Sequence, residues 1–128
     1  MAVRIVRLGS RRAAREGLRV GTVRRPPRGV PKREHARQDW YDVWLPELSP
    51  SPALVKQALA ASSEREWKAF TRRFAREMAA PGPGRLLDLL AALSHHGDFS
   101  IGCYCEDEAR CHRSVLRDLL SERGARVV

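Results

Sequence analysis

Residues 99–113 read F-S-I-G-C-Y-C-E-D-E-A-R-C-H-R and carry the clearest structural pattern in this chain. Between Phe99 and Cys105, apolar or cysteine side chains alternate with small or polar ones, as in a strand with two different faces. A helix is expected to begin at Asp107 or Glu108, because acidic residues favour the first turn of a helix. Its predicted apolar face comprises Val115, Leu116, Leu119 and Leu120. The stretch therefore predicts a strand that leads into a helix, the repeating unit of α/β folds.

Further strands are predicted near both ends of the chain. Val3 to Leu8 alternates apolar and basic residues, and Leu18 to Val23 has the same character. Asp39 to Leu45 is expected to be a short strand or extended segment, and Ala125 to Val128 a returning strand. Together these elements predict one α/β domain over residues 1–128. We expect a small, mostly parallel sheet with helices packed on it, in a Rossmann-like three-layer sandwich.

Three helices are expected in the middle of the chain. The first spans about Pro52 to Ala61, with Ser51 as its N-cap. The second begins at the capping box Ser63-x-x-Glu66. Its apolar stripe comprises Trp67, Phe70, Phe74 and Met78. The run Pro81-Gly-Pro-Gly84 is expected to stop this helix, so that a third one spans about Arg85 to Ser94. The residues predicted to be buried on the third helix are Leu86, Leu89, Leu90 and Leu93.

The net charge of +9 is concentrated at the N-terminal end. Residues 1–38 hold twelve Lys and Arg against two acidic residues, whereas residues 39–128 hold twelve against thirteen. The run R-R-P-P-R-G-V-P-K, from Arg24 to Lys32, cannot form a helix, because its three prolines fix φ and remove backbone donors. It belongs to a predicted basic loop over residues 24–38. This asymmetry indicates a nucleotide or nucleic acid as partner, although an arginine-rich genome explains it equally well.

The size and hydropathy of the chain predict a cytoplasmic protein. Its length suits one domain with a buried core. The longest apolar run, Leu86 to Leu93, is interrupted by Asp88 and is too short to span a membrane. Met1 to Leu8 contains Arg4 and Arg7 and lacks the apolar segment of a signal peptide. We therefore expect no membrane contact and three cysteines that stay reduced as thiols.

The Cys/His/Arg motif of residues 103–113 is expected to lie at the carboxyl end of a strand, where ligands bind in open α/β sheets. The N-terminus of the following helix offers unpaired N–H groups, and neighbouring arginines add positive charge. A phosphate or carboxylate suits such a place. The ligand-binding residues predicted for this pocket are Arg24, Arg28, Lys32, Arg110, Arg113 and Tyr41.

Catalysis by the motif would use His112 as a general acid or base, because an imidazole titrates near neutral pH. The candidate nucleophiles are Cys111, beside His112 near a helix N-terminus, and Cys105 at the strand end. A zinc site of three thiols and an imidazole is a less favoured alternative, since Cys111 and His112 as neighbours on a helix would point about 100° apart. We therefore assign no metal ligand and identify no cofactor, and we expect Cys103 to pack in the core.

Aromatic and histidine residues outside the motif have simpler interpretations. Trp40 and Tyr41 are candidates for stacking on nucleotide bases beside the basic loop. Trp44 is expected to pack in the core. Exposed positions are expected for the remaining histidines, His35, His95 and His96.

Five motifs follow one another along the chain. They are E-G-L-R-V-G-T-V-R-R-P-P-R-G-V-P-K (Glu16 to Lys32), D-W-Y (Asp39 to Tyr41), L-S-P-S (Leu48 to Ser51), E-W-K-A-F-x-x-x-F (Glu66 to Phe74) and C-x-C-x5-C-H-R (Cys103 to Arg113). In order and spacing the chain resembles, from about Val3 to Leu120, the domain of unknown function 488 family. The resemblance implies a small cytosolic α/β domain without an established activity. It also implies a shared pocket formed by Arg28, Lys32, Cys111, His112 and Arg113.

The chain departs from this family at two points. One branch of the family has a tryptophan-proline-arginine-glycine run where this chain has Pro26-Pro27-Arg28-Gly29. Other members lack the cysteines, so the resemblance does not imply obligatory cysteine catalysis for the family.

The first hypothesis is a domain that binds a phosphate-bearing ligand, a nucleotide or a nucleic acid, in a basic pocket at a strand end. The alternatives are a cysteine-dependent enzyme for sulfur transfer or hydrolysis, and a zinc-binding or purely structural Cys/His cluster. The first hypothesis requires that Arg28 and His112, distant in the sequence, meet in space.

Overall fold

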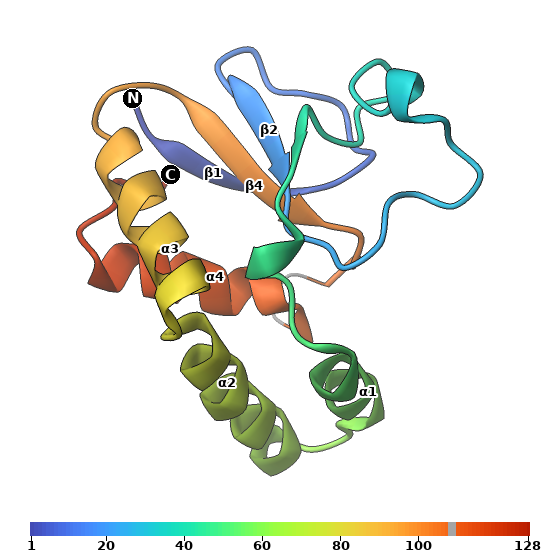
Figure 1. Cartoon of the computed structure of the whole chain (residues 1–128), viewed down its shortest axis with the longest axis vertical. Helices are drawn as coiled ribbons and strands as arrows, with labels where there is room; N and C mark the ends of the chain where they lie inside the picture. The colour runs from blue at the N-terminus through green and yellow to red at the C-terminus, as the bar shows by residue number, and fades with distance from the viewer. Residues whose placement is uncertain (108–109) are drawn as a thin grey trace.

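The computed structural model describes residues 1–107 and 110–128 (Figure 1). Its centre is a four-stranded parallel sheet in the order β1-β4-β2-β3. The strands are β1 (Val3–Arg7), β2 (Leu18–Gly21), β3 (Val43–Trp44) and β4 (Phe99–Cys103). The parallel sheet and its helices confirm the predicted α/β fold, which is of the Rossmann-like kind.

Strand β4 comes last in the sequence but lies in the middle of the sheet, between β1 and β2. All five of its residues are buried. Ile101 packs in the main core with Val3 and Val20 of the two neighbouring strands. On the opposite face, Gly102 allows a close approach, because a Cβ there would lie 2.7 Å from the carbonyl oxygen of Val6. This placement brings the carboxyl ends of three parallel strands together.

In the part of the chain that the structure describes, four α-helices and two short 3-10 helices accompany the sheet. They are α1 (Pro52–Ala60), α2 (Glu64–Met78), α3 (Pro81–Leu93) and α4 (His112–Glu122), with η1 (Lys32–Glu34) and η2 (Pro46–Leu48). Figure 1 shows the four α-helices gathered on one side of the sheet, where α4 contacts β1 and β4. The predicted stripe of α2 is confirmed by its four buried residues, Trp67, Phe70, Phe74 and Met78.

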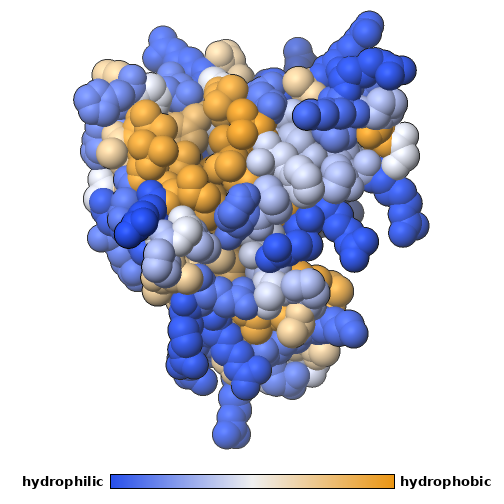
Figure 2. Space-filling model, viewed as in Figure 1, coloured by the Kyte–Doolittle hydropathy of each residue, from blue (hydrophilic) through white to orange (hydrophobic). Residues whose placement is uncertain are grey.

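Helix α3 begins four residues earlier than predicted, because the run from Pro81 to Gly84 forms its first turn instead of stopping α2. The first turn of a helix tolerates proline, since its N–H groups have no intrahelical partner. The buried residues also differ from the prediction: Leu87 and Leu90 face the core, whereas Leu89 and Leu93 are exposed. Figure 2 shows hydrophobic residues gathered on the surface over α3.

Helix α4 begins at His112, later than the predicted start at Asp107 or Glu108. Cys111 is its N-cap and has an extended backbone, with φ −128° and ψ 148°. Asp107 lies in the preceding loop, and Glu108 lies outside the described residues. Cys105 therefore lies in the loop that follows β4, beyond the end of the strand at Cys103.

The other face of the sheet is covered by the segments that flank β2, and no α-helix of the described residues lies there, so the second helical layer of the predicted three-layer sandwich is not seen (Figure 1). A buried ion pair holds these segments on the sheet. Arg19 is 0% exposed and Glu16 is 2% exposed. Nε and Nη2 of Arg19 donate to the Glu16 carboxylate at 2.5 and 2.8 Å. The same carboxylate accepts from Ser100 Oγ on β4, and Arg19 Nη1 donates to the carbonyl oxygens of Ser10 and Asp39. This pair was not predicted from the sequence, because the groups that complete it, Ser100 and two carbonyl oxygens, come from distant parts of the chain.

Two predictions of burial are wrong. Trp44 is 40% exposed on the edge strand β3, where its Nε1 donates to the carbonyl oxygen of Val23 at 2.7 Å. His35 is buried instead of exposed, because its ring packs edge-on against Tyr41 and its Nε2 donates to the carbonyl oxygen of Val30.

The C-terminal segment returns to the sheet as an isolated parallel bridge to β1. Among the described residues, no helix combines the length and hydrophobicity needed to cross a membrane.

Candidate functional site

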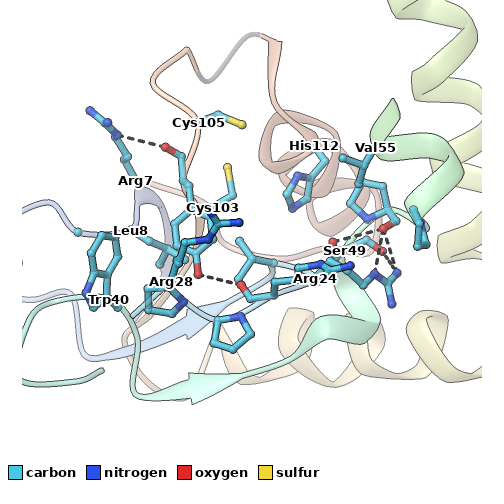
Figure 3. A pocket seen from close by; sticks show the side chains of 18 of the residues that line it. Arg7, Leu8, Arg24, Arg28, Trp40, Ser49, Val55, Cys103, Cys105 and His112 are labelled. Atoms are coloured by element: carbon cyan, nitrogen blue, oxygen red, sulfur yellow. Dashed lines mark hydrogen bonds between the residues drawn. The ribbon is translucent and has the colours of Figure 1, made fainter. Parts of the chain in front are cut away.

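A pocket of about 1010 Å³ lies at the carboxyl ends of β1, β4 and β2 (Figure 3). Its walls come from the residues that follow these three strands, from the loop around Trp40 and from the first turns of α1. Five cationic side chains line it, Arg7, Arg24, Arg25, Arg28 and Lys56. Among the described lining residues there is no carboxylate. The local charge of the pocket is therefore strongly positive.

The five cations differ in how they are held. Arg24 is fixed against the carbonyl oxygens of Ser49 and Pro50, to which it donates three hydrogen bonds of 2.9 to 3.2 Å. Arg7 donates to the carbonyl oxygen of Tyr104 at 3.3 Å and reaches the exposed Glu106 at 3.5 Å.

The other three cations of the pocket are Arg25, Arg28 and Lys56. Their side chains are exposed and donate no hydrogen bond to the described part of the protein. An anion in the pocket could therefore bind these three cations without the loss of a hydrogen bond within the described part of the protein.

One wall of the pocket is aromatic. The rings of Trp40 and Tyr104 meet edge-to-face with centroids 5.8 Å apart. Trp40 packs over Gly9, where a Cβ would lie 2.8 Å from the indole ring. The hydroxyl of Tyr104 donates to the carbonyl oxygen of Arg25 at 2.9 Å, and burial raises the pKa of this phenol. The wall therefore offers an apolar ring face beside the positive charges.

Two cysteines and a histidine form a second cluster, which borders the pocket. The Sγ atoms of Cys103 and Cys111 are in bonding contact, and His112 Nδ1 lies 3.8 Å from Cys111 Sγ. His112 Nε2 lies 2.6 Å from the carbonyl oxygen of Thr22, which can only accept, so Nε2 carries the proton. Burial lowers the pKa of His112 to about 4, and the imidazole is therefore neutral at pH 7 with an unprotonated Nδ1.

Four of the residues predicted for the site line this pocket together, although they come from distant parts of the sequence. They are Arg24, Arg28, Cys105 and His112 (Figure 3). Arg28 and His112, which are distant in the sequence, thus line the same pocket.

The structure places the other predicted binding residues elsewhere. Lys32 is exposed on η1, outside the lining of the pocket. Arg110 pairs with Glu64 at 2.8 Å and lies over the ring of Trp67. Arg113 is buried and donates to the carbonyl oxygen of Glu106.

Tyr41 is also outside the pocket, since its ring packs on Gly21 under the loop. Its hydroxyl is buried without a hydrogen-bond partner among the described residues, and this burial raises the pKa of the phenol. Tyr41 therefore supports the loop that carries Trp40.

The three cysteines have different surroundings. Cys105 is an exposed free thiol on the pocket wall. Cys103 is buried, as expected for a core residue. Cys111 is buried too, and its Sγ is in contact with that of Cys103. A buried sulfur in contact with a second sulfur is poorly placed to attack a ligand, which leaves Cys105 as the better candidate nucleophile.

Among the lining residues with a positive charge or an aromatic ring, four were not predicted from the sequence, namely Arg7, Arg25, Lys56 and Tyr104. Arg7 and Tyr104 follow the apolar part of a strand, so the strand-end rule that selected Cys105 could have selected them. Lys56 had no such signal, because its position depends on how α1 packs beside the loop.

A parallel α/β sheet with a cationic pocket at the carboxyl ends of its strands defines a small Rossmann-like domain. The chain belongs to the DUF488 family, since the family model described as "Active DUF488-N3 subclade" matches residues 3–124. This match confirms the resemblance found in the sequence motifs. No curated protein and no solved structure was found to match the chain.

Proposed function

We propose that this protein binds a phosphate-bearing ligand, a nucleotide or a segment of nucleic acid, in the pocket at the carboxyl ends of β1, β4 and β2. One observation carries the proposal: the pocket has five cationic lining residues and no carboxylate among its described ones. Phosphate is the common biological group that needs several cations at once, and Arg and Lys are its usual ligands.

The unpartnered cations suit the phosphate itself. Arg25, Arg28 and Lys56 can turn toward an anion without breaking a hydrogen bond within the described protein. Arg24, which is held by two carbonyl oxygens, adds a fixed positive charge. Each charge-assisted hydrogen bond contributes about 1.5–3 kcal/mol, and so roughly 10–150-fold in the dissociation constant.

The aromatic wall suits the base of the same ligand. Stacking of a base on an aromatic ring contributes about 1–3 kcal/mol and tolerates any base. Trp40 is half-buried, packs against Gly9 and lines the pocket, where its ring is accessible to a base. A ligand with both a phosphate and a base would therefore contact the cations and the aromatic wall, whereas inorganic phosphate would contact the cations alone.

The test is a titration of the protein with ATP and with a short single-stranded oligonucleotide, followed by calorimetry. Arg28→Ala and Lys56→Ala should each weaken binding by at least about tenfold. For the oligonucleotide, each change should also reduce the slope of log K against log salt by about 1. Arg72→Ala is the matched control, because Arg72 is an exposed arginine on α2 outside the pocket. Equal affinities for all four proteins would refute the proposal.

A second candidate function is thiol chemistry by Cys105 on the bound ligand. It is favoured by the position of Cys105, an exposed free thiol on the wall of the same pocket. The description of the matched family model names an active subclade, which keeps a catalytic role under consideration. This candidate predicts that iodoacetamide modifies Cys105 well before the two buried cysteines. It also predicts that Cys105→Ser still binds the nucleotide but no longer converts the bound ligand. Full turnover by Cys105→Ser would eliminate it.

A further inference from the structure

We infer that Cys103, Cys111 and His112 form a binding site for zinc or another thiophilic divalent cation, with one coordination position open to the basic pocket. Each residue offers one ligand atom, and these atoms lie within 4.8 Å of one another. Cys103 and Cys111 are buried and His112 is partly buried, so the three donors converge inside the protein.

The donor set selects the class of metal. Two thiolates and a neutral imidazole are ligands that Zn²⁺ prefers, whereas Ca²⁺ and Mg²⁺ require oxygen ligands. The trio contains no carboxylate, and its histidine presents Nδ1 toward the sulfur of Cys111. The cluster therefore matches a soft transition metal.

The histidine of the trio is already oriented as metal-bound histidines are. Such a histidine usually donates its second ring N–H to a carbonyl or carboxylate, which fixes its tautomer and its direction. His112 donates Nε2–H to the carbonyl oxygen of Thr22. Thr22 is held in turn by β4, because its backbone N–H and its hydroxyl both donate to the carbonyl oxygen of Gly102 at 2.9 Å. Gly102 directly precedes Cys103, so the support and one ligand share a strand.

The spacing of the two cysteines also favours a bridging ion. Their Cα atoms are 7.8 Å apart. Disulfides usually span about 4.4–6.8 Å between Cα atoms, and a wider pair needs backbone movement to be bridged directly. Two thiolates on one zinc ion each bond to the metal at about 2.3 Å, so their sulfurs need not meet. The backbone therefore suits a shared ion better than a direct bond.

The backbone of Cys111 removes the objection that sequence analysis raised against zinc. That objection placed Cys111 and His112 on one helix, with side chains pointing in different directions. Cys111 instead precedes α4 with extended φ and ψ, and its Sγ lies on the same side as His112 Nδ1. The change from extended to helical backbone at this junction therefore allows the side chains of Cys111 and His112 to point to the same place.

The open coordination position is inferred from the number of ligands and their place. The described residues supply three protein ligands, the number found in catalytic zinc sites, where water or substrate takes the fourth position. Cys103 and His112 both line the basic pocket, so this position faces it. That part of the inference rests on the proposed function, because an anionic ligand in the pocket would reach the ion.

The test is a titration of the reduced, full-length protein with Co²⁺, followed by absorption spectroscopy. We expect one equivalent of Co²⁺ to bind with the charge-transfer band of two thiolates and the strong visible bands of a tetrahedral site, and Zn²⁺ to displace it. Cys103→Ser and Cys111→Ser should each lower the affinity for Co²⁺ more than hundredfold, and His112→Gln at least tenfold. Cys105→Ser, which removes the thiol outside the trio, should leave the affinity unchanged.

Two results would overturn the metal site: no Co²⁺ uptake by the wild-type protein, or equal uptake by the wild-type and Cys103→Ser proteins. The wild-type titration needs no variant, and circular dichroism of each apo variant shows whether it is folded. Inorganic phosphate should change the visible bands of the Co²⁺ form. Unchanged bands would overturn the open position, whereas nucleotide binding without Co²⁺ uptake would overturn the metal site and leave the proposed function intact.

Discussion

Replacing Glu16 by glutamine should destabilise the protein strongly, although the change removes a single charge and keeps the shape of the side chain. Removing one partner of a buried ion pair typically costs about 3–5 kcal/mol, because the other charge stays buried without compensation. Arg19 is fully buried, and the Glu16 carboxylate accepts two of its hydrogen bonds. The carbonyl oxygens of Ser10 and Asp39 would remain as neutral acceptors. A loss of this size is a large part of the stability of an ordinary domain.

The dependence of this loss on pH follows from the pKa of Glu16. Burial by itself would raise this pKa, but the hydrogen bonds from Arg19, Ser100 and the backbone of Ala13 lower it below the ordinary value of 4.5. A carboxyl group with a lowered pKa stabilises the fold above its unfolded pKa, and the stabilisation disappears as pH falls through the folded pKa. The difference between wild type and Glu16→Gln should therefore be full at pH 7 and shrink below about pH 4.5.

Urea denaturation at pH 7 and at several lower pH values measures this difference. Glu47→Gln is the control, because Glu47 is exposed and makes no hydrogen bond within the described residues, and surface changes stay within about 0.5 kcal/mol. If Glu16→Gln were as stable as the control at pH 7, the buried pair would not hold the loops to the sheet, and the reasoning would be refuted.

Three further predictions concern other parts of the molecule. Gly21→Ala should lower the free energy of unfolding by about 1–3 kcal/mol, because the new methyl group would collide with the ring of Tyr41, whereas Gly82→Ala, in open space, should change it little; urea denaturation compares the two. Ser63→Ala should cost about 1 kcal/mol, since the Ser63 hydroxyl accepts the N–H of Glu66 at the start of α2; an unchanged melting temperature would contradict this. Arg110→Ala should leave ATP affinity unchanged in calorimetry, because Arg110 pairs with Glu64 outside the pocket, and a tenfold loss would contradict the assignment of the site.

The parts of the fold that were predicted are those with strong local patterns. The stripe of α2 indicates a period and a buried face, and both are confirmed. The predicted strand after Asp98 is confirmed as β4, although it ends at Cys103 instead of Cys105 and is buried on both faces. Local rules failed where two interpretations compete. The run from Pro81 to Gly84 suits a helix stop and also a helix start, and packing selected the start. Leu89 and Leu93 have the same spacing as buried leucines but face solvent, because α3 is covered on one side.

The candidate site shows a similar division. Arg28 and His112 could be proposed as partners, because strand ends and helix starts meet at one edge of a parallel sheet. Whether a given cation turns toward that edge depends on contacts that no pattern encodes. Arg110 pairs with Glu64 and lies over the ring of Trp67 instead. Lys56 lines the pocket because α1 packs beside it. The burial of Arg19 is of the same kind, since it depends on Glu16 and on two carbonyl oxygens brought by tertiary structure.

A crystal structure with adenosine monophosphate would show directly whether the cationic pocket binds a nucleotide. We expect the phosphate to lie in the pocket within hydrogen-bond distance of Arg28, and the base to stack on Trp40. An empty pocket in crystals grown at a saturating concentration of the nucleotide, or a nucleotide bound on another face of the sheet, would contradict this expectation.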